Sequence, residues 1–339
     1  MKIRRGVTAL SAAAIALTVS AAPAQAAATV AASRLSVPWG VGFLPDGTLL
    51  FTERTTGKIK QLRDGTVSNI QTVPGVTPAG EGGLLGLAVS PKFTEDKTVF
   101  IYYTTGSDNR IASLNLGSPP TPIVTGIPRG TQIHNGGRLA FGPDGFLYAG
   151  TGDAGNSANA QDTSSLAGKI LRMTPDGKPA PGNPFGTLVY SYGHRNAQGL
   201  TWTPDGKLYE AELGQDKWDE LNLIEPGRNY GWPTCEGKCG RPEFVDPLVV
   251  WATSEASPSG IAYYKNNLYM AGLRGARMWV IPVTNTGPAG PHAIYQGQFG
   301  RLRSPVAGPD GMLWFATSNR DGRGSPVTED DRLIRSDGT

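Results

Sequence analysis

Six times along the chain, two apolar runs typical of strands flank a short polar turn. In four copies the turn is Pro-Asp-Gly, and these copies span residues 41–53, 139–153, 200–214 and 306–319. Two looser copies fill the gaps at residues 87–104 and 261–273. Asp-Gly between apolar runs favours a tight hairpin, because glycine supplies positive φ without steric cost. The pattern therefore predicts six β-hairpins.

A further short strand, in which basic and apolar residues alternate, follows most of these hairpins. Examples are residues 57–65, 168–177, 276–283 and 331–338. Repeats of roughly 45–60 residues that each form a few antiparallel strands are typical of a β-propeller. We therefore expect residues 28–339 to form one all-β domain, a six-bladed β-propeller with four-stranded antiparallel blades. Strands near the two chain ends would share one blade. Two β-sandwiches are the alternative, but they would not explain six copies of one hairpin.

The first 27 residues have the features of a secretory signal peptide. Lys2, Arg4 and Arg5 form a basic head, residues 7–19 are apolar, and Ala24-Gln25-Ala26 provides a small-residue cleavage site. The apolar run is too short for a transmembrane helix, so we expect export and no integral membrane segment. Removal of this segment leaves equal numbers of basic and acidic residues. With no basic stripe, the sequence does not indicate a nucleic-acid partner.

Two cysteines, Cys235 and Cys239, lie four residues apart in CEGKC. In an oxidising compartment this spacing favours a small disulfide loop. A metal site is the alternative, but no further cysteine exists and no histidine is close in sequence. The motif for covalent haem attachment, C-x-x-C-H, is absent.

A propeller usually binds its ligand at one mouth of the central channel, between loops of several blades. The loops that flank the predicted hairpins carry Glu81, His134, Arg195, Asn196, Trp251, Thr253, Arg274, Arg301 and Arg303. Taken singly, His134 is explained as a histidine satisfied by the backbone, and each arginine as a surface residue. Their equivalent positions in different blades instead favour a shared site. Several arginines indicate an anionic, oxygen-rich ligand.

Five segments carry a family resemblance: GLLGLA, HNGGRLAFGPDG, GHRNAQGL, WDELNLIEPGRNYGWP and GRLRSP. In this order they resemble the soluble glucose/sorbosone dehydrogenase family, over essentially the whole chain after the signal peptide. The resemblance implies a six-bladed propeller that uses pyrroloquinoline quinone (PQQ) and calcium.

The resemblance also implies roles for individual residues. His134 corresponds to the general base that takes the proton of the substrate hydroxyl. Arg195 and Asn196 correspond to residues at the reactive edge of the cofactor, and Thr253 to a residue lining its pocket. Arg274, Arg301 and Arg303 correspond to cations that pair with the cofactor's carboxylates. Glu81 and Trp251 are the expected substrate contacts, and Trp251 also matches a side chain lining the cofactor pocket.

Two calcium sites are implied in the same way. Gly214 and Gln215 correspond to backbone carbonyl ligands beside the cofactor, and Glu220 and Tyr230 to ligands of a second, structural calcium. A solvated pair of acids at residues 219 and 220 is the alternative to the second site.

The substrate side departs from the family pattern. Glu81 stands where the glucose-oxidising member has glutamine, Gln215 replaces a proline, and Ile133 replaces an aspartate next to His134. We therefore expect His134 to lack an adjacent carboxylate, and glucose to be a poor default substrate.

The expected function is that of an exported quinoprotein dehydrogenase. It would oxidise a sugar-like small molecule and pass electrons to an external electron acceptor. The alternative is a non-catalytic binding ectodomain, although such a protein needs no base beside a quinone pocket. A calcium-dependent hydrolase would need acidic or amide ligands around one metal at the channel axis, whereas this mouth is rich in arginine.

Overall fold

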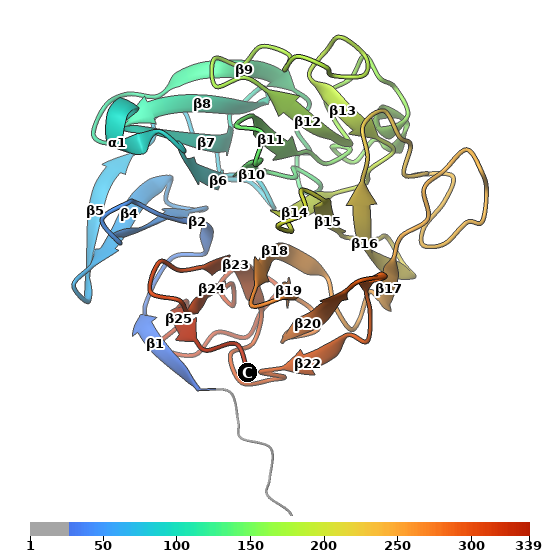
Figure 1. Ribbon diagram of the computed structural model, residues 1–339. Helices are drawn as coiled ribbons and strands as arrows, with labels where there is room; N and C mark the ends of the chain where they lie inside the picture. Colours follow the sequence, from blue (N-terminus) through green and yellow to red (C-terminus); the bar gives the residue numbers. More distant parts are fainter. Residues whose placement is uncertain (1–26) are drawn as a thin grey trace, which may run out of the picture.

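The computed structural model describes residues 27–339 and shows six antiparallel sheets around a central axis (Figure 1). Each sheet is one blade, with its first strand innermost. The all-β, six-bladed architecture expected from the repeats is confirmed. Residues 1–26 of the expected signal peptide lie outside the described residues.

The first three blades have the same plan. Blade 1 consists of β2 (Pro38–Phe43), β3 (Leu49–Glu53), β4 (Lys58–Arg63) and β5 (Thr66–Thr72). Blade 2 consists of β6 (Leu84–Val89), β7 (Thr98–Thr104), β8 (Asn109–Asn115) and β9 (Thr121–Ile127). Blade 3 consists of β10 (Arg138–Phe141), β11 (Leu147–Gly150), β12 (Lys169–Met173) and β13 (Val189–Tyr192).

The remaining blades vary at their outer edges. Blade 4 consists of β14 (Ala197–Trp202), β15 (Leu208–Glu212), β16 (Trp218–Ile224) and β17 (Val249–Ala252). Blade 5 consists of β18 (Pro258–Tyr264), β19 (Asn267–Gly272), β20 (Arg277–Thr284), β21 (Gly287–Pro288) and β22 (His292–Ile294), the last two both pairing with β20. Blade 6 consists of β23 (Leu302–Ala307), β24 (Leu313–Thr317), β25 (Leu333–Ser336) and β1 (Ala28–Ala32).

Helix is almost absent from the described residues. One α-helix, α1 (Phe93–Asp96), and one 3-10 helix, η1 (Ser157–Ala160), are each four residues long. Within residues 27–339, no helix has the length and apolar character needed to cross a membrane.

The hairpins form where the sequence predicts them, and glycine has the expected role in their turns. Gly47 and Gly145 adopt φ values of 85° and 77°. Each donates its backbone N–H to the carbonyl three residues earlier, over distances of 2.9 and 3.0 Å. A residue with a Cβ atom pays a steric cost at such φ values, so the repeated Asp-Gly pair explains the repeated turn.

The two ends of the described chain close the ring. β1 pairs with β25 in blade 6, so that Ala28 lies opposite Ser336 and Val30 opposite Ile334. On the inner side of the ring, β23 of blade 6 contacts β2 of blade 1. The expected blade shared between both ends is present, and the ring has no open seam.

The hydrophobic core is divided among the interfaces between neighbouring blades. Within residues 27–339 there are six buried clusters; each lies between two adjacent blades, and one of them also includes Trp39 of a third blade. Between blades 2 and 3, for example, Phe100 and Tyr102 pack with Leu147 and Leu171. Because every blade is packed on both faces, the loops at the channel mouth rest on a rigid base.

A buried lysine organises the loop between β11 and β12. Lys169 has no exposed surface, and its Nζ donates to the carbonyl oxygens of Asn159 at 2.6 Å, Ala167 at 2.6 Å and Ala160 at 3.2 Å. Burial lowers the pKa of Lys169 to about 8. The loop that folds around this ammonium group also contains Asp153, whose carbonyl accepts a hydrogen bond from Asn159 Nδ2 at 2.9 Å.

Replacement of this lysine should destabilise the whole domain. Lys169→Met keeps the aliphatic stem but leaves three carbonyls without their donor, so we expect the free energy of unfolding to fall by about 3 kcal/mol. Urea denaturation measures this change. Lys207→Met, on an exposed hairpin turn, is the matched control and should cost less than ~0.5 kcal/mol. Equal losses in the two variants would contradict the role of Lys169.

Candidate active site at the channel mouth

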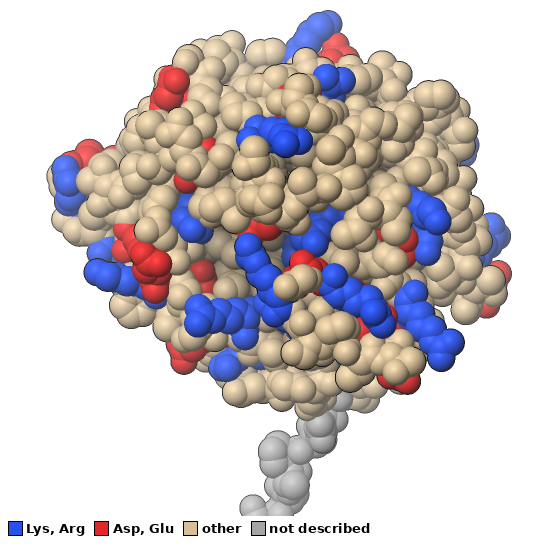
Figure 2. Space-filling model, turned by 180° about the vertical axis from the view of Figure 1, so that it is seen from behind, with Lys and Arg blue, Asp and Glu red and all other residues tan. Residues whose placement is uncertain are grey.

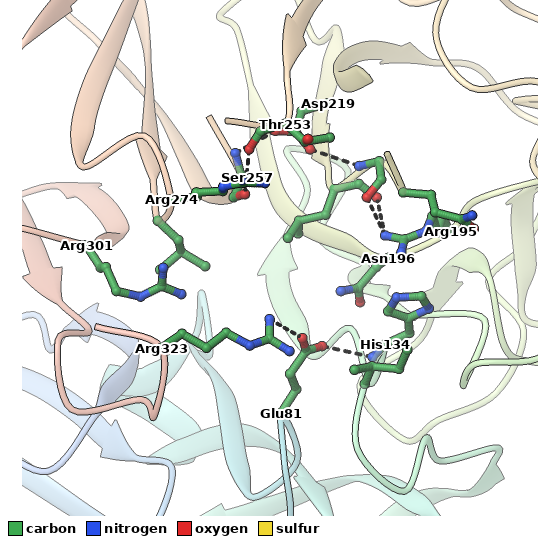
Figure 3. A pocket seen from close by; sticks show the side chains of 15 residues that line it. Glu81, His134, Arg195, Asn196, Asp219, Thr253, Ser257, Arg274, Arg301 and Arg323 are labelled. Atoms are coloured by element: carbon green, nitrogen blue, oxygen red, sulfur yellow. Dashed lines mark hydrogen bonds and ion pairs between the residues drawn. The ribbon is translucent and has the colours of Figure 1, made fainter. Parts of the chain in front are cut away.

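A cavity of about 450 Å³ lies at one mouth of the channel, between loops of blades 2 to 6 (Figure 3). It brings together nine of the residues expected at a site: Glu81, His134, Arg195, Asn196, Gly214, Gln215, Thr253, Arg274 and Arg301. Figure 2 looks onto a face of the ring on which Lys and Arg side chains surround a central hollow. The convergence expected from the repeat positions is therefore found.

His134 is held in a defined tautomer by a carboxylate. Its Nδ1 lies 2.7 Å from Asp153 Oδ1, and both residues are buried. Asp153 also accepts hydrogen bonds from the Gly155 backbone at 2.7 Å and from Trp232 Nε1 at 2.9 Å. Because an ionised Asp153 requires Nδ1 to donate, Nε2 keeps the lone pair.

Asp153 corrects the expectation that His134 lacks a carboxylate partner. Burial alone would raise the pKa of Asp153, but the hydrogen bond and charge of His134, with the Gly155 and Trp232 donors, lower it overall. The residue before the histidine is Ile133 and carries no carboxylate. The carboxylate that contacts His134 instead belongs to Asp153, in the loop after β11 of the same blade. The acid in the TGDAG segment, placed after a hairpin like the other site residues, was the available signal.

Glu81 fixes the backbone of the histidine loop. Its Oε2 accepts the backbone N–H of His134 at 2.8 Å, and its Oε1 forms an ion pair with Arg323 at 2.9 Å (Figure 3). His134 has a φ of 58°, an uncommon value for a residue other than glycine. Glu81 therefore holds the backbone of the histidine loop in place, in addition to lining the cavity. Arg323, which sequence analysis missed, lies beside it.

Arg195 and Asn196 lie beside the histidine. Arg195 Nη1 donates to the carbonyl oxygens of Leu213 at 3.1 Å and Gly214 at 2.5 Å. Arg195 Nε is buried and has no hydrogen-bond partner among the described residues. Asn196 Oδ1 accepts the Gly136 backbone N–H at 3.0 Å, which fixes the orientation of the amide. The site therefore has hydrogen-bond donors close to His134.

The turn at residues 213–218 presents backbone carbonyls to the cavity. It is anchored by Glu236, which is far from it in sequence but in direct contact with it. Glu236 Oε1 accepts the backbone N–H groups of four consecutive residues, 215 to 218, at 2.8 to 3.0 Å. These hydrogen bonds outweigh the opposing effect of burial and lower the pKa of Glu236. Glu236 belongs to the small loop closed by the disulfide between Cys235 and Cys239. The disulfide loop therefore positions the carbonyl turn.

The carbonyl turn fits the calcium expected there. The Leu213 and Gly214 carbonyls both accept hydrogen bonds from Arg195 Nη1, so a calcium ion bound to these oxygens would take the place of that guanidinium nitrogen. Asp219 lines the same cavity, and burial raises its pKa to about 6. An oxygen-only donor set of this kind suits calcium. Gln215 also lines the cavity.

Glu220 lies away from the mouth cavity, in a buried acidic group. Asn222 Nδ2 donates to Glu220 Oε2 and to Glu210 Oε2, both at 3.1 Å, and Glu212 contacts His194 at 2.9 Å. Burial, with the charge of Glu212, raises the pKa of Glu220 to about 8. Glu210 Oε1 and Asn222 Oδ1 are buried without a partner among the described residues. These free oxygens fit a cation.

The sequence analysis did not identify three members of this group, namely Glu210, Glu212 and His194. Glu210 and Glu212 are two residues apart in β15, so their side chains lie on the same face of the strand. Tyr230 stacks on His194, with the ring centroids 4.7 Å apart. Its hydroxyl donates to the Leu223 carbonyl at 2.6 Å and accepts the Glu225 backbone N–H at 2.8 Å. This leaves only the main chain of Tyr230 to serve as a ligand.

Two further expected site residues, besides Glu220 and Tyr230, do not line the mouth cavity. Trp251 is buried in the core between blades 4 and 5, with its ring centroid 5.7 Å from that of Trp279, because β17 is the outermost strand of its blade. Arg303 is buried farther along the channel, on inner strand β23. The expectation that Trp251 contacts substrate or cofactor at this mouth is not met.

The chain resembles known proteins both in sequence and in structure. Residues 35–334 match the family described as glucose/sorbosone dehydrogenase. The structure of the PQQ-bound form of aldose sugar dehydrogenase from Streptomyces coelicolor is 51% identical, with a TM-score of 0.88, covering 93% of this chain and 98% of that one. Aldose sugar dehydrogenase YliI of Escherichia coli is 28% identical over 89% of this chain and 92% of its own length. Quinoprotein glucose dehydrogenase B of Acinetobacter calcoaceticus is 33% identical over 60% of this chain and 52% of its own length.

Removal of the Glu236 carboxylate should loosen the carbonyl turn. Glu236→Ala deletes the shared acceptor of four amides, so we expect hydrogen exchange of residues 215–218 to accelerate by roughly 10-fold or more. Mass spectrometry of the exchanged protein measures this locally. Glu243→Ala is the control, because Glu243 is exposed and its ion pair is with nearby Arg241. Unchanged protection of residues 215–218 would show that Glu236 does not anchor the turn.

Proposed function

The chain belongs to the glucose/sorbosone dehydrogenase family, and we propose that it is an exported quinoprotein dehydrogenase that oxidises a sugar or a related hydroxy or aldehyde compound. The observation that carries the proposal is the buried pair of His134 and Asp153 at the wall of a cavity shared with Arg195 and Asn196. A propeller that only binds a ligand has no need of a base held in one tautomer, so the alternative of a non-catalytic binding domain is less well supported.

PQQ and calcium are the proposed cofactors. The PQQ-bound relative from Streptomyces supports the quinone at 51% identity. Thr253, Arg274 and Arg301 would hold its polar edge, and the backbone carbonyls of Gly214 and Gln215 would hold calcium. When bound, the quinone supplies the acceptor for a hydride, and calcium increases the polarity of its carbonyl.

The residues of this chain would act on the substrate hydroxyl. His134 Nε2 would take the hydroxyl proton while the carbon that bears this hydroxyl loses its hydride. Asp153 keeps Nδ1 protonated and stabilises the positive charge that the imidazole then carries. The Arg195 guanidinium and the Asn196 amide donate hydrogen bonds where negative charge develops.

Substrate class and electron acceptor are proposed at a general level. Aldose sugar dehydrogenase YliI supports a sugar-like substrate. Glu81 lines the cavity, but each of its carboxylate oxygens already has a partner in the protein. We therefore do not assign substrate specificity to a free Glu81 carboxylate. Electrons would pass to an external acceptor. Export would follow from the signal peptide expected at residues 1–27.

Reconstitution tests the activity directly. Purified apo-protein loaded with PQQ and calcium should reduce an artificial dye in the presence of an aldose or alditol. His134→Ala should bind PQQ with similar affinity but turn over ~10²–10⁴-fold more slowly, because it lacks the general base. Dye reduction measures turnover, and fluorescence titration measures cofactor affinity. Failure of the wild-type protein to bind PQQ saturably would sink the proposal, and full turnover by His134→Ala would remove the base assignment.

Replacement of Asp153 separates orientation from proton transfer. Asp153→Asn keeps the size of the side chain but allows the other histidine tautomer and removes the charge opposite the imidazolium. We expect kcat to fall by roughly 10- to 10³-fold, with KM and cofactor affinity changed little. Steady-state kinetics on the reconstituted enzyme measure the split. Asp162→Asn, on the exposed part of the same loop, is the control; a kcat equal to wild type in Asp153→Asn would contradict the orienting role.

A further inference from the structure

The channel has a second mouth, at the end opposite the candidate active site. A cavity of about 350 Å³ lies there, walled by the inner strands of all six blades, β2, β6, β10, β14, β18 and β23 (Figure 1). The mouth cavity is lined by loops that precede these strands, as His134 and Arg195 show. The second cavity is lined instead by residues farther along the strands, such as 41–43 and 139–141. We call it the far cavity.

The far cavity is apolar apart from one charge. Most of its wall consists of aliphatic side chains, and Phe43, Phe141 and Tyr263 add half-buried aromatic rings. Among the described residues that line it, Arg138, the first residue of β10, is the only one that carries a charge. The far cavity therefore differs in character from the mouth cavity, where several charged side chains meet.

Arg138 is a buried cation without an acidic partner. It is 9% exposed, and within residues 27–339 its hydrogen bonds go to neutral oxygens. Nε donates to the Gln198 carbonyl at 2.8 Å, and Nη2 donates to Ser304 Oγ at 2.9 Å. Burial lowers the pKa of Arg138 to about 9, and the charge of Asp321, which acts on Arg303, does not reach it. A buried guanidinium without an anion is costly, because the charge has lost its hydration.

One edge of the Arg138 guanidinium has no acceptor in the described chain. The two hydrogen bonds to Gln198 and Ser304 use the edge that Nε shares with Nη2. The other edge consists of Nη1 and the second N–H of Nη2, and Nη1 makes no hydrogen bond to residues 27–339. Nη1 is not sealed from solvent either, and the cavity that Arg138 lines is the far one. A planar edge with two parallel N–H groups is the fork that binds a carboxylate in bidentate fashion.

Trp39 separates Arg138 from the candidate active site. The guanidinium carbon of Arg138 lies 4.3 Å from the centroid of the Trp39 ring, and that of Arg303 lies 5.3 Å from it. Trp39 is 1% exposed and lines a small cavity next to the mouth cavity, together with Arg303. Arg138 lines neither of those two cavities. A ligand of Arg138 must therefore enter from the far mouth.

We propose that the far cavity binds a small apolar monocarboxylate, with its carboxylate on the free edge of Arg138 and its hydrocarbon part against the apolar wall. The guanidinium matches the carboxylate in geometry and in charge. The cavity volume is near the lower end of the range for small-molecule sites, roughly 300–1,000 Å³, so it suits one aromatic ring with a short chain. A sugar fits poorly, because its hydroxyl groups would lose water against this wall without gaining partners. The site is independent of the function proposed above.

Two ligands that differ in charge but hardly in shape test the site. 3-Phenylpropionate and its neutral amide are titrated into the purified protein by calorimetry at pH 7. Wild type should bind the carboxylate at least ~10-fold more tightly than the amide, because hydrogen bonds between charged groups are the stronger ones. Arg138→Met should lose this preference but bind the amide as wild type does. Unchanged amide binding shows that the cavity of the variant is intact, which a structural role of Arg138 alone would not explain.

A variant at the rim tests the location without altering the buried arginine. Ala307 is exposed and lines the far cavity, so the indole of Ala307→Trp should obstruct the entrance and weaken binding of both ligands by at least ~10-fold. Thr66→Trp, at an exposed position of outer strand β5, is the matched control and should bind both as wild type. Arg274→Gln removes a charge at the mouth cavity and should leave both affinities unchanged.

Three results would overturn the proposal. One is a wild-type protein that does not bind 3-phenylpropionate, or that binds it no more tightly than the amide. The second is carboxylate binding that persists at wild-type affinity in Arg138→Met or in Ala307→Trp. The third is binding that is lost in Arg274→Gln, which would place the carboxylate at the mouth cavity instead.

Discussion

Closure of the ring is the constraint on which the other features depend. Each blade is packed on both faces, so none moves without opening two of the six apolar interfaces. The pairing of β1 with β25 places both ends of the described chain in one blade and so closes the ring. Because the blades repeat one strand order, the loops that precede their inner strands meet at the same end of the channel. A site assembled from five blades is thereby held as firmly as one built on a single element.

Interactions between blades then set the chemistry of the mouth. The backbone of His134, in blade 3, is held by Glu81 from the loop before blade 2. Asp153, which orients the imidazole, is held by Trp232 from a loop of blade 4. These contacts are short and partly buried, so they are stronger than they would be in bulk water. The orientation of the proposed base is therefore a property of three neighbouring blades, rather than of the histidine loop alone.

The sequence predicts the parts of the site that follow from repetition. Equivalent loop positions bring His134, Arg195 and Arg274 to one mouth, and the turn residues predict the hairpins that carry them. The depth of a side chain along the channel is harder to predict from sequence. A shift of two residues along a strand moves a side chain by about 7 Å, which is enough to place it in a different part of the channel. Arg301 thus reaches the mouth cavity while Arg303 lies deeper on β23. Pairings such as Asp153 with His134 depend on loop paths that no periodicity in the sequence describes.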